Sequence, residues 1–149
     1  MTDVQDAAPG PVSPELVAAR LEKNVILAAR SLSMVGARYH VFLQPAIVTT
    51  GKALSEREKR WRFGKTAYFN DPEYHKRCYD RIDDVFRAHR LPVNAAYTSL
   101  RGIFDALSAE REIFLDSYHL GDQGNYLVAA AMVEALQTSP ERSVDKGAE

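Results

Sequence analysis

Two residues near the carboxyl end of the sequence have the types and spacing for acid–base chemistry. Asp116 precedes His119 by three residues, directly after the apolar run 113–115. A carboxylate that accepts a hydrogen bond from imidazole Nδ1–H fixes the tautomer and leaves Nε2 able to take a proton. The spacing therefore predicts an orienting acid and a general base. In the alternative interpretation, Asp116 caps a turn and His119 is an ordinary loop residue bonded to backbone.

A nucleophile for this pair is not evident in the sequence. Four serines fall at helix caps or inside helices of the predicted elements: Ser13, Ser31, Ser33 and Ser55. Ser99 and Ser108 stay open as candidates, although neither segment resembles a strained nucleophile turn. The sequence therefore predicts half of a hydrolytic mechanism.

Composition excludes several classes of protein. A chain of 149 residues fits one domain, and its net charge of -1 gives no global field for nucleic acid or an anionic membrane. The single Cys78 excludes an intramolecular disulfide. The apolar run 127–133 is far shorter than the ~20 residues of a membrane span, and residues 1–10 carry acids where a signal peptide is basic. The default expectation is a cytoplasmic protein.

The folded part is expected over residues 13–137, between disordered tails at 1–12 and 138–149. Ser13 and Pro14 predict a helix start, and Gly36 predicts its end. The helix carries an apolar stripe that is expected to pack against a sheet: Val17, Leu21, Val25, Ala28, Leu32 and Val35.

A strand, two helices and a turn region are expected next. Residues 39–43 predict a buried central strand that ends at Gln44. Ser55 and Glu58 fit a capping box that begins a short helix. Asp71 begins an amphipathic helix. Its apolar face is formed by Tyr74, Cys78, Ile82, Val85 and Phe86. The side expected to face water carries Lys76, Arg77, Asp80, Asp83, Asp84 and Arg87. Residues 95–97 suggest a short extended piece, followed by one or two helical turns around 100–107.

The last predicted elements are a second clear strand at 113–115 and a helix capped by Gly121 or Asp122. The run 127–133 is apolar nearly all round, so this helix is expected to be largely buried. The order of elements predicts an α/β fold with parallel strands, in which sites lie beyond the carboxyl ends of strands. The predicted acid–base pair falls there.

Two segments resemble the SGNH (GDSL-type) hydrolases. Residues 114–129, FLDSYHLGDQGNYLVA, are similar to the last block of that family, and residues 39–45, with Lys52 and residues 55–58, are similar to the preceding segment. The resemblance spans about residues 14–137. It implies a partial flavodoxin-like, three-layer fold with a short parallel sheet, and a serine esterase acting on acyl or carbohydrate esters without a cofactor. It makes Asp116 the orienter and His119 the base of a Ser-His-Asp triad.

The chain departs from the family at the nucleophile and the oxyanion hole. The family carries an N-terminal Gly-Asp-Ser block and a Gly-x-Asn-Asp segment. Here Asn70-Asp71 has Tyr68 in the glycine position, and Gln123 stands where a Gly-Asp-Ser serine would be. The nucleophile-bearing strand is therefore expected to be absent, and the chain alone is expected to be inactive.

Three residues are candidates for substrate contact: Gln44, Trp61 and Tyr68. The basic and aromatic segment 52–65 could instead be a nucleic-acid or membrane patch, but a solvated helix and loop is the simpler interpretation. His75 and Cys78 lack a second ligand pair, so no metal is expected, and His40 and His89 are interpreted as structural.

The competing interpretation of the whole chain is a non-catalytic interaction module or a fragment that associates with another chain. A sheet without its first strand has an unpaired edge, which favours association. This interpretation predicts a homo-oligomer or a complementing chain as partner.

Overall fold

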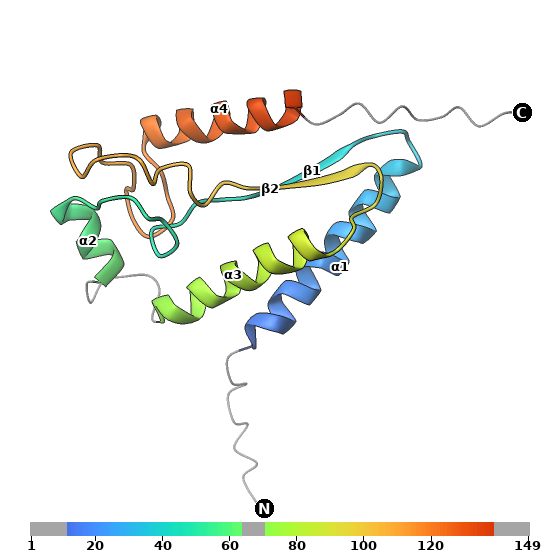
Figure 1. Ribbon diagram of the computed structural model, residues 1–149, viewed down its shortest axis with the longest axis horizontal. Helices are drawn as coiled ribbons and strands as arrows, with labels where there is room; N and C mark the ends of the chain where they lie inside the picture. Colours follow the sequence, from blue (N-terminus) through green and yellow to red (C-terminus); the bar gives the residue numbers. More distant parts are fainter. Residues whose placement is uncertain (1–11, 64–70, 139–149) are drawn as a thin grey trace, which may run out of the picture.

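The computed structural model describes residues 12–63 and 71–138 and has helices on both sides of a small sheet (Figure 1). The elements in chain order are α1 (Pro14–Ser33), β1 (Tyr39–Leu43), α2 (Glu56–Phe63), α3 (Pro72–Ala88), β2 (Ala95–Ser99) and α4 (Asp122–Thr138). β1 and β2 pair in parallel, from Tyr39 opposite Ala95 to Leu43 opposite Ser99. In Figure 1, α1 and α3 lie below the strands and α4 lies above them. The fold is mixed α/β, as the sequence predicts.

The helix starts are confirmed by their capping bonds. The Ser13 hydroxyl accepts from the backbone N–H of Leu16 at 3.2 Å, and the Asp71 carboxylate accepts from Tyr74 N–H at 2.8 Å. The predicted capping box is complete, because Ser55 Oγ accepts from Glu58 N–H at 3.1 Å and Glu58 Oε2 accepts from Ser55 N–H at 3.0 Å. These local signals therefore fix where three of the helices begin.

One of the two apolar clusters lies between α1, α3 and the lower face of the sheet. Its buried members are Ala18, Val25, Ile82, Val85 and Phe86, with Tyr39, Val41 and Leu43 of β1 packed against them. α1 contacts α3 more extensively than β1, so the expected helix-on-sheet packing is mostly helix-on-helix packing. Val35, the last member of the predicted stripe, is 78% exposed beyond the helix end.

The second strand is β2, and the prediction of a strand at 113–115 is wrong. Within the described residues, this segment makes only an isolated antiparallel bridge, Phe114 to Leu120. The reason is that the backbone N–H groups of Ile113 and Phe114 donate to the Glu58 carboxylate and not to a neighbouring strand. The segment around 100–107, where one or two helical turns are predicted, forms successive hydrogen-bonded turns and no continuous helix.

Three predictions of burial need correction. β1 is half-buried at every residue and has one neighbouring strand among the described residues, so it is not a central strand. In α4 only Gly124 is buried, and Tyr126, Val133 and Leu136 are exposed, because a sheet of two strands covers only part of the helix. Asp83, expected in water, is buried and accepts hydrogen bonds from Tyr97 and Arg101.

The predicted tails, 1–12 and 138–149, lie almost wholly outside the described residues, so their disorder remains a prediction. Across residues 12–63 and 71–138, no helix combines the length and apolar character needed to cross a bilayer.

Candidate functional site

Asp116 and His119 lie together in one turn. His119 Nδ1 is 2.6 Å from Asp116 Oδ2, and Asp116 Oδ1 accepts from the backbone N–H groups of Tyr118 at 2.9 Å and His119 at 2.8 Å. Asp116 therefore caps the turn and contacts the imidazole at the same time, so the two interpretations of the sequence are compatible. The side chains are 36% and 61% exposed, respectively.

The surroundings of Asp116 favour its carboxylate form. Partial burial raises the pKa of Asp116, but hydrogen bonds from Tyr118 N–H and from the side chain and N–H of His119 lower it by more. The net effect is a pKa below the ordinary range for aspartate. A carboxylate that stays ionised can accept from Nδ1–H and stabilise an imidazolium.

Two backbone hydrogen bonds within the loop and one side-chain hydrogen bond from the end of β1 hold this turn in place. Leu115 N–H donates to His119 O at 2.9 Å, and Gly121 N–H donates to Ile113 O at 2.8 Å. Gln44 lies just after β1, and its side-chain N–H donates to Tyr118 O at 2.9 Å. The turn therefore sits at the carboxyl end of β1, where the sequence predicts a site.

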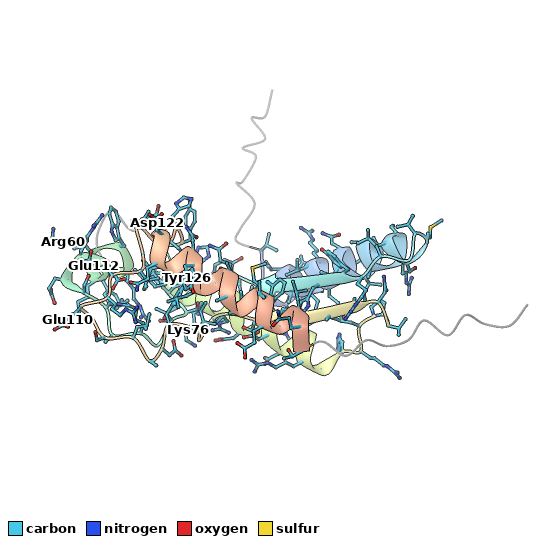
Figure 2. All side chains as sticks on the ribbon, turned by 90° about the horizontal axis from the view of Figure 1, so that it is seen from above. Arg60, Lys76, Glu110, Glu112, Asp122 and Tyr126 are labelled. Carbon is cyan, nitrogen blue, oxygen red and sulfur yellow. The ribbon has the colours of Figure 1, made fainter. Side chains whose placement is uncertain are left out.

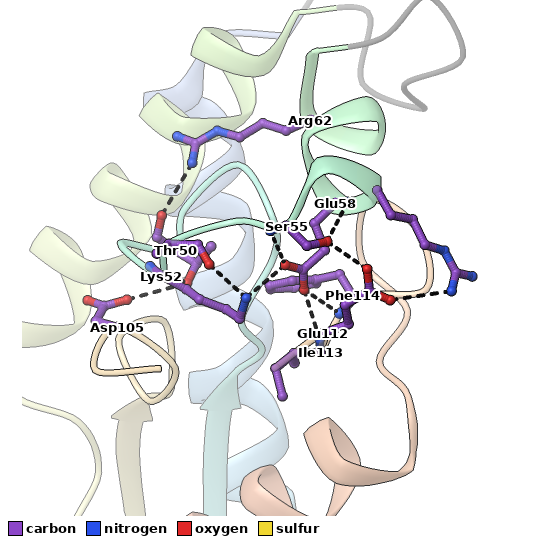
Figure 3. A network of polar contacts seen from close by, with 11 residues as sticks. Thr50, Lys52, Ser55, Glu58, Arg62, Asp105, Glu112, Ile113 and Phe114 are labelled. Carbon is purple, nitrogen blue, oxygen red and sulfur yellow. Dashed lines mark hydrogen bonds and ion pairs between the residues drawn. The ribbon is translucent and has the colours of Figure 1, made fainter. Parts of the chain in front are cut away.

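A buried polar cluster around Glu58 holds the base of the same loop (Figure 3). Glu58 Oε1 accepts from Ile113 N–H at 2.8 Å and Phe114 N–H at 3.1 Å, while Oε2 lies 2.7 Å from Lys52 Nζ. Both charged side chains have no exposed area. The prediction of a solvated helix and loop is therefore wrong for Lys52 and Glu58. The capping box predicts Glu58 as a cap, but no local signal shows that Glu58 also accepts from Ile113 and Phe114, 55 and 56 positions further along.

The pKa of Glu58 is also lowered. Its burial raises the pKa, but the Lys52 ammonium and the backbone N–H groups of Ile113, Ser55 and Phe114 lower it by more. Each oxygen of this carboxylate accepts at least two donors, so its charge is fully compensated inside the protein. Glu58 is thus a structural support for the loop that carries Asp116.

A pocket of about 380 Å³ lies beside His119, between the end of β1 and α4. Its lining residues are Phe42, Gln44, Leu100, His119, Leu120, Asn125, Val128 and Met132. His119 is the one imidazole in this lining; the others are apolar residues and two amides. A proton acceptor beside an apolar wall and amide groups suits a small, uncharged, partly apolar ligand.

The three predicted substrate-contact residues have different positions. Gln44 lines the pocket, whereas Trp61 packs against the second apolar cluster, which includes Phe104 and Phe114, and is not part of the lining. Tyr68 lies outside the described residues. Contact of these residues with a substrate stays a prediction.

Several serine hydroxyls donate to acceptors other than the imidazole, and Ser31 and Ser33 donate to carbonyls of their own helix. Ser55 donates to Glu112, Ser99 to Asp83 and Ser117 to the Trp61 carbonyl. None of these three bonds makes a serine the partner of His119. The described part of the chain thus supplies the acid and the base and not an evident nucleophile.

Two other histidines, His40 and His89, have partners on neighbouring elements. His40 Nε2 is 2.8 Å from Thr98 Oγ1, and its ring stacks on Phe42 with centroids 4.2 Å apart. His89 Nδ1 is 2.5 Å from Glu22 Oε1, which joins the end of α3 to α1. The described residues contain no group of three or more His, Cys, Asp or Glu side chains that could hold a metal ion.

Comparison of the chain with models of protein families, with curated proteins and with solved structures finds no match.

Proposed function

We propose that Asp116 and His119 form the acid–base half of an ester-hydrolysing site of the SGNH type, with a small acyl or carbohydrate ester as substrate. One observation carries this proposal: the imidazole is bonded to a carboxylate at 2.6 Å and also lines a pocket. The two residues that the family resemblance assigns as orienter and base are the two that meet. A lone surface histidine would have neither the carboxylate nor the pocket.

The chemistry follows from the geometry. Asp116 accepts from Nδ1–H, so Nε2 carries the lone pair that removes a proton from an attacking hydroxyl or water. The imidazolium formed in this step is stabilised by the same carboxylate, and its proton is then available for the leaving alkoxide. The side-chain amide of Gln44 donates one N–H to the Tyr118 carbonyl, and that of Asn125 donates one N–H to the Leu120 carbonyl. A dedicated oxyanion hole is therefore not part of this proposal, and slow turnover is expected.

The test is hydrolysis of p-nitrophenyl acetate by the purified chain. Full esterase activity is not expected without a nucleophile, but a positioned imidazole can act as general base on water, so the wild type should exceed the buffer rate by up to about 10²-fold. His119→Ala should abolish this excess and Asp116→Asn should reduce it. His89→Ala is the matched control. His89 is also an exposed histidine paired with a carboxylate, but it lies at the C-terminal end of α3 and is not part of the pocket lining. Equal rates for wild type and His119→Ala would exclude the proposal.

A second candidate function is a non-catalytic module that associates with another chain. Two features favour it: both outer edges of the sheet lack a neighbouring strand within residues 12–63 and 71–138, and α4 exposes Tyr126, Val133 and Leu136. Tyr126, labelled on α4 in Figure 2, is 72% exposed. Association is tested by measuring molar mass in solution over a range of concentrations, and a monomer that binds no other chain would contradict this candidate.

A further inference from the structure

The outer edge of β1 presents unpaired backbone groups. Tyr39 N–H donates to Asn94 O at 2.8 Å, and Leu43 O accepts from Leu100 N–H at 3.0 Å. Because alternate residues of a strand point their backbone groups to opposite sides, Tyr39, Val41 and Leu43 bond to β2 while His40 and Phe42 point outward. Within the described residues, nothing bonds to the N–H and C=O groups of His40 and Phe42.

The sequence of this edge lacks the features that protect exposed strands. Native edges carry lysines, prolines, bulges or inward-pointing charges, whereas residues 38–44 carry one charge, that of Arg38, and Pro45 follows only after the strand. β2 differs, because it consists of small and polar residues and a tyrosine, and Ser99 and Tyr97 are tied to Asp83. Of the two outer edges, that of β1 is therefore the one more open to pairing with a further strand.

An apolar flank of α1 lies beside the same edge. Seen from above, α1 lies along β1 and α3 lies along β2 (Figure 2). Glu22 of α1 contacts His89 at the end of α3, so by helical periodicity Val17 and Ala28 lie toward the opposite flank of α1, although Val17 also packs against the apolar cluster between α1, α3 and the sheet. Both are only half-buried. An added strand or helix on this side would cover them.

We propose that two copies of the chain pair through β1 in antiparallel orientation, about a two-fold axis at Val41. The product is a sheet of four strands with the two β1 strands at its centre and the two α1 flanks meeting beneath it. His40 of each copy would face Phe42 of the partner subunit in a hydrogen-bonded pair, giving about four backbone hydrogen bonds. This inference specifies the association named above as the second candidate and does not depend on the chemistry of Asp116 and His119.

A second copy suits this edge for three reasons. Outward groups at His40 and Phe42 are symmetric about Val41, so the edge is complementary to itself. The one charged residue, Arg38, would face Gln44 of the partner subunit, so no like charges oppose each other. A two-fold axis normal to the sheet keeps both α1 helices on one side, where their half-buried apolar flanks can cover each other.

The test compares His40→Pro with His40→Ala by sedimentation equilibrium. Proline removes the outward N–H while the bonds from β1 to β2, made by Tyr39, Val41 and Leu43, remain. Alanine removes the same imidazole and keeps the N–H. We expect wild type and His40→Ala to dimerise and the dissociation constant of His40→Pro to rise by about tenfold or more. A monomeric wild type, or equal dimerisation of the two variants, would overturn the inference.

A cross-link tests the same interface if His40→Pro fails to fold. In a non-hydrogen-bonded antiparallel pair the two Val41 Cα atoms would be about 4.5 Å apart, within disulfide range. Val41→Cys in a Cys78→Ser background should give disulfide dimers on mild oxidation, and much faster than the exposed control Val93→Cys. Equal rates would overturn the β1 interface. A dimer that persists in His40→Pro would also overturn the β1 interface. It would not contradict association by another surface or the proposed ester hydrolysis.

Discussion

Two carboxylates, each paired with a nitrogen side chain, support the same loop, and the pairs differ in what remains available for chemistry. Lys52 and Glu58 are fully buried, and both carboxylate oxygens of Glu58 accept hydrogen bonds, from the Lys52 ammonium and from backbone N–H groups. Asp116 and His119 are 36% and 61% exposed, and the imidazole borders a pocket. A buried pair with all its bonds made contributes to structure and has no capacity left for a ligand. Asp116 of the exposed pair caps its turn, and the imidazole beside it borders the pocket, so this pair is the one of the two that a ligand could reach.

The largest effect should come from Glu58→Ala. This change leaves Lys52 buried without its partner and removes the acceptor of Ile113 N–H and Phe114 N–H, so unfolding should become easier by about 3–5 kcal/mol. Urea unfolding measures it. The control is Glu56→Ala on the same helix, which removes an exposed pair with Lys59 and should leave the midpoint unchanged. A loss for Glu58→Ala no larger than for the control would remove the distinction between the two pairs.

A smaller loss is expected for Gly124→Ala, on the other side of the loop. A Cβ at this position would lie 2.8 Å from Ile113 Cγ2 and 3.0 Å from Leu120 Cβ. Overpacking of this kind costs about 1–3 kcal/mol, which exceeds the gain of about 1 kcal/mol from replacing a helical glycine. Thermal unfolding should show a lower midpoint. An unchanged or higher midpoint would mean that Ile113 moves freely, contrary to its attachment to Glu58.

Acid should weaken the buried pair progressively. The folded pKa of Glu58 lies below the ordinary 4.5, so its stabilisation is complete above about pH 5 and is lost as the pH falls through the folded value. Asp116 is also lowered, from 3.8, and acts in the same direction. Urea unfolding between about pH 6 and pH 3 should show this decline. In Glu58→Gln the decline should be shallower, and an identical slope would exclude Glu58 as its source.

The sequence predicts well what depends on neighbours in the chain. The caps at Ser13, Ser55 and Asp71 are made within three residues, and β1 ends where Gln44 and Pro45 interrupt it. Asp116 and His119 are also three residues apart, so their contact needs only a turn. For this reason the candidate acid and base could be identified before their geometry was known.

The failed predictions depend on partners far along the chain. Residues 113–115 have a strand-like composition, but Glu58 takes the backbone donors that a strand would use. Asp83 has the polarity of a surface residue, but Tyr97 and Arg101 supply donors that compensate its burial. The exposed side of α4 follows from the width of the sheet, which no residue in the helix encodes.

The smallest effect on stability should come from the pair proposed to do the chemistry. His119→Ala removes one exposed contact with Asp116, so the free energy of unfolding should change by less than about 1 kcal/mol. The informative measurement is therefore the imidazole tautomer of His119, read from its ¹⁵N chemical shifts in mildly alkaline solution. In the wild type, Nδ1 should carry the proton, because Asp116 Oδ2 accepts it at 2.6 Å.

Asp116→Asn sharpens this last prediction because it keeps the shape of the side chain. The amide oxygen can still accept from the N–H groups of Tyr118 and His119, while an NH₂ group placed toward Nδ1 would favour a proton on Nε2. We therefore expect the protonated nitrogen to change from Nδ1 to Nε2 with the fold intact. His89→Ala should leave the His119 signals unchanged. If wild type and Asp116→Asn gave the same tautomer, the carboxylate would not orient the imidazole, and the exposed pair would be no more than a capped turn.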